Sequence, residues 1–170
     1  MKTLKECFIT TERPYQEGTV EVFEQTVPAA RRATLSITAL GVYEARINGK
    51  KVGDHFLAPG YTYYPLDLHI QTYDVTEFLT RPANTLRVAL GQGWYCGRFT
   101  CDNKTQIYGE RPAVSWILTV ETGAETKVFT SADSTVQAVE SPWRSASLYD
   151  GEDYCADGAG LPILPPVPFT

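Results

Sequence analysis

The feature that most constrains the fold is a set of alternating apolar and polar segments between residues 34 and 98. Apolar side chains recur at every second position in three of these segments: Leu35, Ile37 and Ala39; Tyr43, Ala45 and Ile47; Leu86, Val88 and Leu90. Because successive side chains of a strand point to opposite faces, this alternation predicts three strands with one buried face each. Asn48-Gly49 tolerates the positive φ of a tight turn, so the strand ending at Ile47 should reverse into Lys51-Val52.

The rest of the chain repeats this organisation, with short strand-like segments separated by turn signals. Further strands are expected at residues 20–28, 70–75, 114–120 and 126–130, and from Trp143 towards residue 154. No stretch keeps a period of 3.6 residues, and the only helical expectation is a single turn capped by Asp74 or Thr76. Short strands at regular intervals predict an all-β chain folded as an antiparallel β-sandwich.

The length of the chain, 170 residues, fits one domain. A chain of this size buries roughly 70% of its unfolded surface, so its core needs no disulfide support. The sandwich is expected at residues 20–157. Residues 1–19 are polar and aperiodic and are interpreted as an N-terminal arm or linker, and the proline-rich residues 158–170 as a second linker.

The charge and hydropathy of the chain argue against two classes of partner. The net charge is −5, and no basic stripe of the kind that binds nucleic acid or an anionic membrane is present. Nothing approaches the ~20 apolar residues of a membrane span, and the first residues lack the apolar core of an export signal. We therefore expect a soluble, cytoplasmic chain with no nucleic-acid or membrane partner.

The four cysteines, Cys7, Cys96, Cys101 and Cys155, form no Cys-x-x-Cys pair. Neither His55 nor His69 lies at a zinc-finger spacing from them. The pattern favours four free thiols in a reducing compartment over a disulfide framework. Cys96 and Cys101 are the one pairing that the spacing suggests.

Catalytic motifs are scarce. The sequence has no nucleophile elbow, no His-Glu-x-x-His, no P-loop and no dinucleotide fingerprint. Asp150, Glu152 and Asp153 cluster on a glycine turn, where carboxylates are solvated or bind a hard cation such as calcium. They are retained as a weak candidate metal site, whereas glycoside hydrolysis by such a pair is the weakest of the three interpretations.

The loop after the Leu86–Leu90 segment carries the strongest indication of binding. A flat aromatic side chain beside polar groups suits the apolar C–H face of a sugar ring. The candidate carbohydrate-binding residues are Trp94, Tyr95, Arg98, Asp102 and Asn103. The alternative is that Trp94 caps the core, as Trp116 on its alternating strand is expected to do. Tyr61, Tyr63 and Tyr64 either extend the aromatic surface or cover a sheet edge, and coverage of an edge is the favoured interpretation.

Six stretches together resemble a known family. They read ALGVYEARINGKKVGD, LAPGYTYY, QTYDVTEFL, NTLRVALGQGWYCGR, YGERPA and SLYDGEDY. Residues 33–154 thus resemble the N-terminal β-sandwich domain of bacterial α-L-rhamnosidases of glycoside hydrolase family 78. The general part of the pattern is shared by many galactose-binding-like jelly rolls. Gly93-Trp94-Tyr95 and the turn at residues 149–152 are its specific part.

The resemblance implies a non-catalytic accessory domain that precedes an (α/α)6 barrel, which supplies the carboxylates that hydrolyse terminal rhamnose. It implies as partners the catalytic domain of the same polypeptide and a rhamnose-containing glycoside, and some related domains bind rhamnose with calcium. The chain departs from the family at Gln92, where an acidic residue is common, and at Cys96, where a basic one is common. Tyr61 and Tyr63 likewise replace a more usual Trp and Asp, and Cys155 follows Tyr154 where an Asp is common. The loss of two acidic positions weakens the case for calcium.

Three hypotheses follow for this chain. The leading one is an accessory domain of an α-L-rhamnosidase-like enzyme that orients the catalytic barrel and contacts substrate. The second is an autonomous carbohydrate-binding module with a site around Trp94, and the third is a structural spacer. Fold analogy alone does not choose among them.

Overall fold

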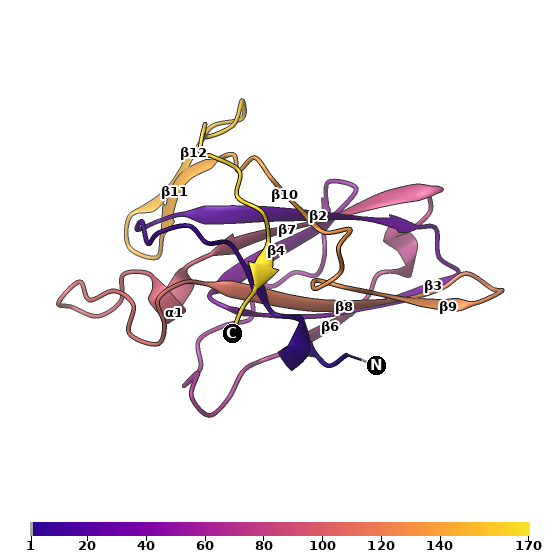
Figure 1. Ribbon diagram of the computed structural model, residues 1–170, viewed down its shortest axis with the longest axis horizontal. Coiled ribbons are helices and arrows are strands. Elements are labelled where there is room, and N and C mark those ends of the chain that lie inside the picture. Colours follow the sequence, from indigo (N-terminus) through magenta and orange to yellow (C-terminus); the bar gives the residue numbers. More distant parts are fainter. Residues whose placement is uncertain (1) are drawn as a thin grey trace.

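The computed structural model describes residues 2–170, which form two antiparallel sheets stacked face to face (Figure 1). The six-stranded sheet contains β13 (Val167–Pro168), β1 (Ile9–Thr10), β8 (Ala113–Glu121), β3 (Arg32–Leu40) and β6 (Gln71–Asp74) in this order, with β9 (Thr126–Thr130) also paired to β8. The five-stranded sheet has the order β10 (Gln137–Val139), β2 (Val20–Pro28), β7 (Ala83–Gly91), β4 (Val42–Ile47) and β5 (Lys50–Lys51). The predicted antiparallel β-sandwich is confirmed.

Three short helices and one hairpin complete the fold. The helices are η1 (Leu4–Cys7), η2 (Thr76–Phe78) and α1 (Gly93–Cys96). The hairpin of β11 (Trp143–Ser147) and β12 (Gly151–Tyr154) forms a separate two-stranded sheet. In Figure 1 it rises over one end of β2, and α1 lies at the same end of the molecule.

The core lies between the two sheets and follows the predicted alternation. Leu35 and Ile37 on β3 and Leu86 and Val88 on β7 are completely buried. Trp116 on β8 is also completely buried and pairs with Ile37 in the sheet register. One face of each strand therefore supplies the apolar surface whose burial stabilises the sandwich.

The turn at Asn48-Gly49 has the predicted geometry. Both residues have positive φ, 52° and 84°, and Ile47 pairs with Lys50. The Asn48 side chain adds a function that the turn itself does not require. Its Nδ2 donates to the Phe78 carbonyl at 2.9 Å, and its Oδ1 accepts from the Thr85 amide at 3.1 Å. This one side chain thus ties the β4–β5 hairpin to β7 and η2.

The helical turn near Asp74 also forms, as η2. The Asp74 carboxylate accepts hydrogen bonds from the backbone amide and hydroxyl of Thr76. Two further elements, β10 and α1, lie in stretches where the sequence predicts no regular structure. β10 is a three-residue edge strand on β2, too short to show alternation.

The segments expected to be an arm and a linker each contribute a strand to the six-stranded sheet. β1 pairs with β8 on one side and β13 on the other. Cys7 and Ile9, next to and within β1, are buried. Both segments thus pack on the sandwich, and the backbone amide of Phe169 donates to the Phe8 carbonyl at 2.9 Å.

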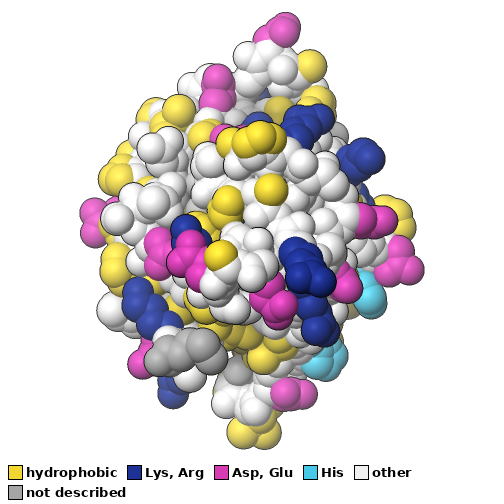
Figure 2. Space-filling view, turned by 90° about the vertical axis from the view of Figure 1, so that its right-hand side faces the viewer, with side chains coloured by type: hydrophobic (Ala, Val, Ile, Leu, Met, Phe, Trp, Pro, Cys, Tyr) yellow, Lys and Arg dark blue, Asp and Glu magenta, His cyan; other side chains and the backbone are white. Residues whose placement is uncertain are grey.

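All four cysteines are free, as the sequence favours. Acidic and basic side chains are interspersed on the face that Figure 2 shows, which is consistent with the lack of a basic stripe. No helix among residues 2–170 is long and apolar enough to cross a membrane.

Candidate functional site

Two loops that are distant in sequence meet at one end of the five-stranded sheet. β7 ends at Gly91 beside Val42, where β4 begins. Tyr43 also forms a β-bridge with Ala58, and its amide donates to the Ala58 carbonyl at 2.6 Å. This bridge holds the chain that follows Ala58 beside the point where β7 continues into α1. The tyrosine-rich loop therefore lies next to Trp94.

Seven aromatic side chains from these loops form one group, which we call the aromatic cluster. Its members are Tyr61, Tyr63, Tyr64, Trp94, Tyr95, Phe99 and Tyr108. Tyr61 is central, with ring centroids 6.0 Å from Trp94 and 5.6 Å from Phe99. The Tyr61 and Tyr108 hydroxyl groups are 2.9 Å apart and share a hydrogen bond. Edge-on and tilted contacts of this kind stabilise aromatic pairs beyond the area they bury.

The aromatic cluster has a buried base and an exposed layer. Tyr95 is 8% exposed and packs edge-on against Tyr64 at 5.2 Å. Loss of hydration raises the pKa of Tyr64 to about 12. Tyr61 and Tyr63 are 47% and 58% exposed, and Trp94 is half-buried outside the core between the sheets. The base fixes the position of the exposed rings, which together form an aromatic surface.

Arg98 connects this end of the molecule to the β11–β12 hairpin. Its guanidinium forms an ion pair with Asp150 on the hairpin turn, and Glu17 lies 3.5 Å from its Nε. Its Cζ also lies 5.4 Å from the centre of the Tyr149 ring. The hydrogen bond from Arg98 lowers the pKa of Asp150 below its ordinary value. Arg98 is thus engaged with the β11–β12 hairpin.

Asp102 and Asn103 lie at the exposed tip of a small hairpin closed by the Phe99–Lys104 bridge. Asp102 forms an ion pair with Lys104 at 3.1 Å, and Asn103 adopts a positive φ of 56°. Their recorded polar contacts stay within this tip. Of the five predicted carbohydrate-binding residues, the structure brings only Trp94 and Tyr95 into the aromatic cluster.

The three acids proposed as a metal site have separate partners. Asp150 pairs with Arg98, Glu152 accepts from the Trp143 indole N–H, and Asp153 lies 3.9 Å from Arg144. Within residues 2–170, no three His, Cys, Asp or Glu side chains gather closely enough to hold a metal ion. The geometry of the described chain therefore adds no support to the calcium hypothesis.

Gln92 and Cys96, where the chain departs from the family pattern, are both buried. The Gln92 side chain donates from Nε2 to the Gln16 carbonyl at 2.8 Å and accepts at Oε1 from the Gly18 amide at 2.9 Å. A carboxylate could make only the second of these bonds. Cys96 is completely buried, and loss of hydration raises the pKa of its thiol to about 12. A charged basic side chain at this position would need a different surrounding structure.

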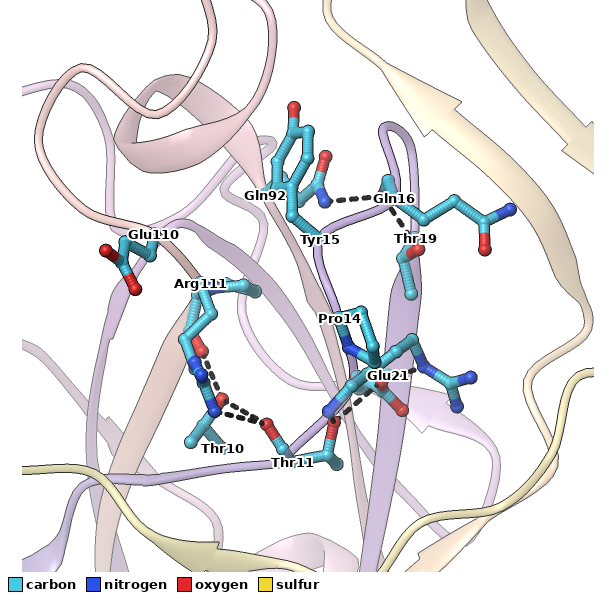
Figure 3. A pocket seen from close by; sticks show the side chains of 12 residues that line it. Thr10, Thr11, Pro14, Tyr15, Gln16, Thr19, Glu21, Gln92, Glu110 and Arg111 are labelled. Carbon is cyan, nitrogen blue, oxygen red and sulfur yellow. Dashed lines mark hydrogen bonds and ion pairs between the residues drawn. The ribbon is translucent and has the colours of Figure 1, made fainter.

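Gln92 also borders a hollow between the N-terminal segment and β2, shown in Figure 3. Thr11 and Arg13 both donate to the Glu21 carboxylate there, at 2.9 and 2.5 Å. The hollow has a volume of about 20 Å³, which is room for one water molecule. It is therefore part of the packing of the N-terminal segment and too small for a sugar.

Sequence reasoning did not predict the contact between Tyr61 and Tyr108, or the central position of Tyr61 in the aromatic cluster. The density of tyrosines at residues 61–64 was a signal, but it left surface extension and edge coverage open. Edge coverage is the interpretation that the sequence favours, whereas the structure brings these rings into contact with Trp94, Tyr95, Phe99 and Tyr108 in an extended aromatic surface.

Fold and loops together define an antiparallel β-sandwich domain with an aromatic surface at one end. Residues 28–159 match the family described as "Alpha-L-rhamnosidase N-terminal domain", and the chain belongs to this family. An α-L-rhamnosidase of Streptomyces avermitilis is 42% identical to it over 125 residues, which are 74% of this chain and 12% of that protein. The chain spans 12% to 15% of the length of the curated relatives that it matches.

Solved structures agree with this assignment. The native α-L-rhamnosidase of Aspergillus terreus superposes with a TM-score of 0.83 and 31% identity, over 96% of this chain and 21% of that one. The Streptomyces avermitilis enzyme complexed with L-rhamnose gives a TM-score of 0.74 and 36% identity, over 81% and 14%. The resemblance stated from the sequence is therefore confirmed at the level of the family.

Proposed function

We propose that this chain is a non-catalytic accessory domain of an α-L-rhamnosidase-type glycoside hydrolase, and that its aromatic cluster contacts the rhamnoside substrate. The observation that supports the proposal most strongly is the aromatic surface that exposed Tyr61 and Tyr63 and half-buried Trp94 form on a buried base. The relatives are several times longer than this chain, so the partner proposed for it is the catalytic domain of the same polypeptide.

The chemistry of the aromatic cluster suits a sugar. The apolar C–H face of a sugar ring stacks on flat aromatic side chains, and its hydroxyl groups need donors and acceptors nearby. The hydroxyl groups of Tyr61 and Tyr108 can supply both, since each can donate and accept. The rings are held by contacts with one another, so little conformational freedom is lost on binding.

An autonomous carbohydrate-binding module is the second candidate. One observation favours it: the rings of the aromatic cluster pack on one another and on Tyr95, which is buried within this domain. A structural spacer is the remaining alternative. It would leave the aromatic surface as the area that packs on the barrel, with no affinity for sugar.

The test is a calorimetric titration of the chain with L-rhamnose, in calcium and again in chelator. We expect saturable heat with a Kd near 1 mM, which corresponds to about −4 kcal/mol, and its loss in Trp94→Ala. Phe56→Ala, which removes an exposed ring outside the aromatic cluster, is the matched control and should bind normally. Absence of heat at millimolar sugar would contradict substrate contact and leave a spacer. Hydrolysis of an aryl rhamnoside by this chain would contradict the non-catalytic assignment.

A further inference from the structure

An apolar depression lies on the outer face of the five-stranded sheet, and it shares no residue with the aromatic cluster. Its volume is about 290 Å³, near the lower end of the range for small-molecule sites. Val42 on β4 and Ala89 and Gly91 on β7 contribute to its lining. These positions alternate with the core residues of the same strands, so the side chains of Val42 and Ala89 face outward and Gly91 leaves space beside them. We call this depression the sheet groove.

The two walls of the sheet groove come from elements that flank the exposed part of the sheet. One wall is the loop after β5, which carries Phe56 and Leu57. The other is the β11–β12 hairpin, which contributes Trp143 and Ala146. The hairpin is tied to the chain just before β2 by a hydrogen bond of 2.7 Å from the Ala146 amide to the Gly18 carbonyl. The groove is therefore built by the fold at a defined place.

The floor of the sheet groove is low because its central strand carries small residues. Ala89 and Gly91 occupy the two outward positions of β7 between the walls. A Cβ added at Gly91 would lie 3.2 Å from the Val42 side chain, so the floor is already closely packed. A larger residue at Ala89 would project into the groove and reduce its volume. The space is thus set by residue size on β7.

The polar groups of the sheet groove are few and of both kinds, because Lys51 and His55 line it together with the carboxylates of Glu44 and Glu152. Glu44 forms an ion pair with Arg46 at 2.6 Å, and Glu152 accepts from the Trp143 indole N–H. Lys51 places its ammonium group 3.9 Å from the centre of the Phe56 ring, where the electron-rich face attracts it. A ligand that fits this lining has apolar faces and can interact with aromatic rings and a cation. It also donates hydrogen bonds to the carboxylates at the edge of the groove.

We propose that the sheet groove binds a planar aromatic ring that carries hydroxyl groups, as in a phenol. Such a ring buries two apolar faces against Val42, Ala89 and Leu57, and its π system can contact Trp143 and the Lys51 ammonium group. Its hydroxyl groups donate to Glu44 or Glu152. A sugar fits less well, because each of its many hydroxyl groups would need a partner on a mostly apolar lining.

This proposal does not depend on sugar binding at the aromatic cluster. The two sites have no lining residue in common, although Phe56 and Leu57 lie on the same loop between β5 and β6 as Tyr61. A failure at one site therefore leaves the other unaffected, and a variant at each site can serve as the control for the other.

The test compares three probes by NMR titration of the isotopically labelled chain: phenol, cyclohexanol and L-rhamnose. Cyclohexanol has the size and hydroxyl group of phenol but no aromatic ring. We expect phenol to shift the amide signals of Val42 and Ala89 and the Trp143 indole signal, with a Kd of about 1–10 mM because so small a ligand buries little surface. Cyclohexanol should bind at least tenfold more weakly, and L-rhamnose should leave these signals in place.

Two variants locate the site. Ala89→Leu should fill the sheet groove and abolish the phenol shifts while the remaining spectrum stays that of the folded chain. Trp143→Ala should weaken phenol at least fivefold, whereas Trp94→Ala should have no effect on it. Equal binding of phenol and cyclohexanol would overturn the aromatic specificity. Undiminished phenol binding by Ala89→Leu, or no shift at all at 20 mM phenol, would overturn the site.

Discussion

Trp116 and Trp94 show two different ways in which this chain uses a large aromatic side chain. Trp116 lies on β8, completely buried between the sheets, and its indole N–H donates to the Gln25 carboxamide at 2.9 Å. Trp94 lies in α1, half-buried, and its recorded ring partner is Tyr61 from a distant loop. The strand alternation determines the position of the first, whereas a bridge between two loops determines that of the second. Stability and binding should therefore respond oppositely to their removal.

The largest effect on stability is expected at the core. Trp116→Ala should lower the free energy of unfolding by about 3–5 kcal/mol, because it leaves a cavity and removes the partner of Gln25. Chemical denaturation of the variant measures this loss. Trp116→Phe, which retains most of the ring contacts, should cost less. A loss below about 1 kcal/mol in Trp116→Ala would show that the core adapts to the cavity.

Gln92 lies between β7 of the sandwich and α1 of the aromatic cluster, and its replacement should have an intermediate effect on stability. Gln92→Glu loses the donor to the Gln16 carbonyl and buries a carboxyl group, so we expect a loss of about 1–3 kcal/mol. Gln137→Glu, on the exposed edge strand β10, is the control and should change stability by less than about 0.5 kcal/mol. Equal stability of the two variants would mean that the Gln92 side-chain bonds contribute nothing.

Trp94→Ala should distinguish the aromatic cluster from the core most clearly, because it should affect binding more than stability. Its ring lies outside the core, so we expect a loss of only about 1 kcal/mol in the free energy of unfolding. Calorimetry should nevertheless show the loss of L-rhamnose binding. Trp116→Ala, examined where it remains folded, should retain that binding. The comparison fails if Trp94→Ala destabilises the chain as strongly as Trp116→Ala does.

The smallest effect is expected from the ion pair between Arg98 and Asp150. Because Arg98 lowers the pKa of Asp150 in the folded state, the pair stabilises the fold above about pH 4, the ordinary pKa range of an aspartate. This contribution is lost as the pH falls through the lowered pKa. Arg98→Gln should raise the pKa of Asp150, measured by NMR titration of its carboxyl carbon, whereas Arg98→Lys should keep part of the shift. An unchanged pKa in Arg98→Gln would contradict the pairing.

The sheets were predictable because local rules determine them. Alternation at Leu35, Ile37 and Leu86 identifies strands with one buried face, and Asn48-Gly49 specifies the turn that joins β4 to β5. The family resemblance added what periodicity cannot supply. The two-residue strands β1 and β13 escaped prediction, because so few residues carry no periodicity and their pairing depends on contacts between opposite ends of the chain.

The candidate site was predictable only in part, for a related reason. Trp94 and Tyr95 are adjacent in sequence, whereas Tyr61 comes from a distant loop. The Tyr43–Ala58 bridge places that loop beside them, and no local sequence pattern predicts this bridge. Arg98 shows how neighbours in sequence can have different partners in space. Its sequence position suggested a partner for a sugar beside Trp94, whereas in space it contacts Asp150 on the hairpin. Of the five predicted carbohydrate-binding residues, Trp94 and Tyr95 are neighbours in the aromatic cluster, and sugar binding by all five remains a prediction.

The pairing of β1 with β13 has a mechanical consequence. The two strands are antiparallel, with Ile9 opposite Pro168 and Thr10 opposite Val167. The segment before Ile9 and the segment after Pro168 therefore leave the pair at the same end. Tension applied at the two ends would load these hydrogen bonds one after another, as in a zipper, and not all at once in shear. A pull along the polypeptide would thus peel β13 from the sheet at low force, before any load reached the long strands of the sandwich.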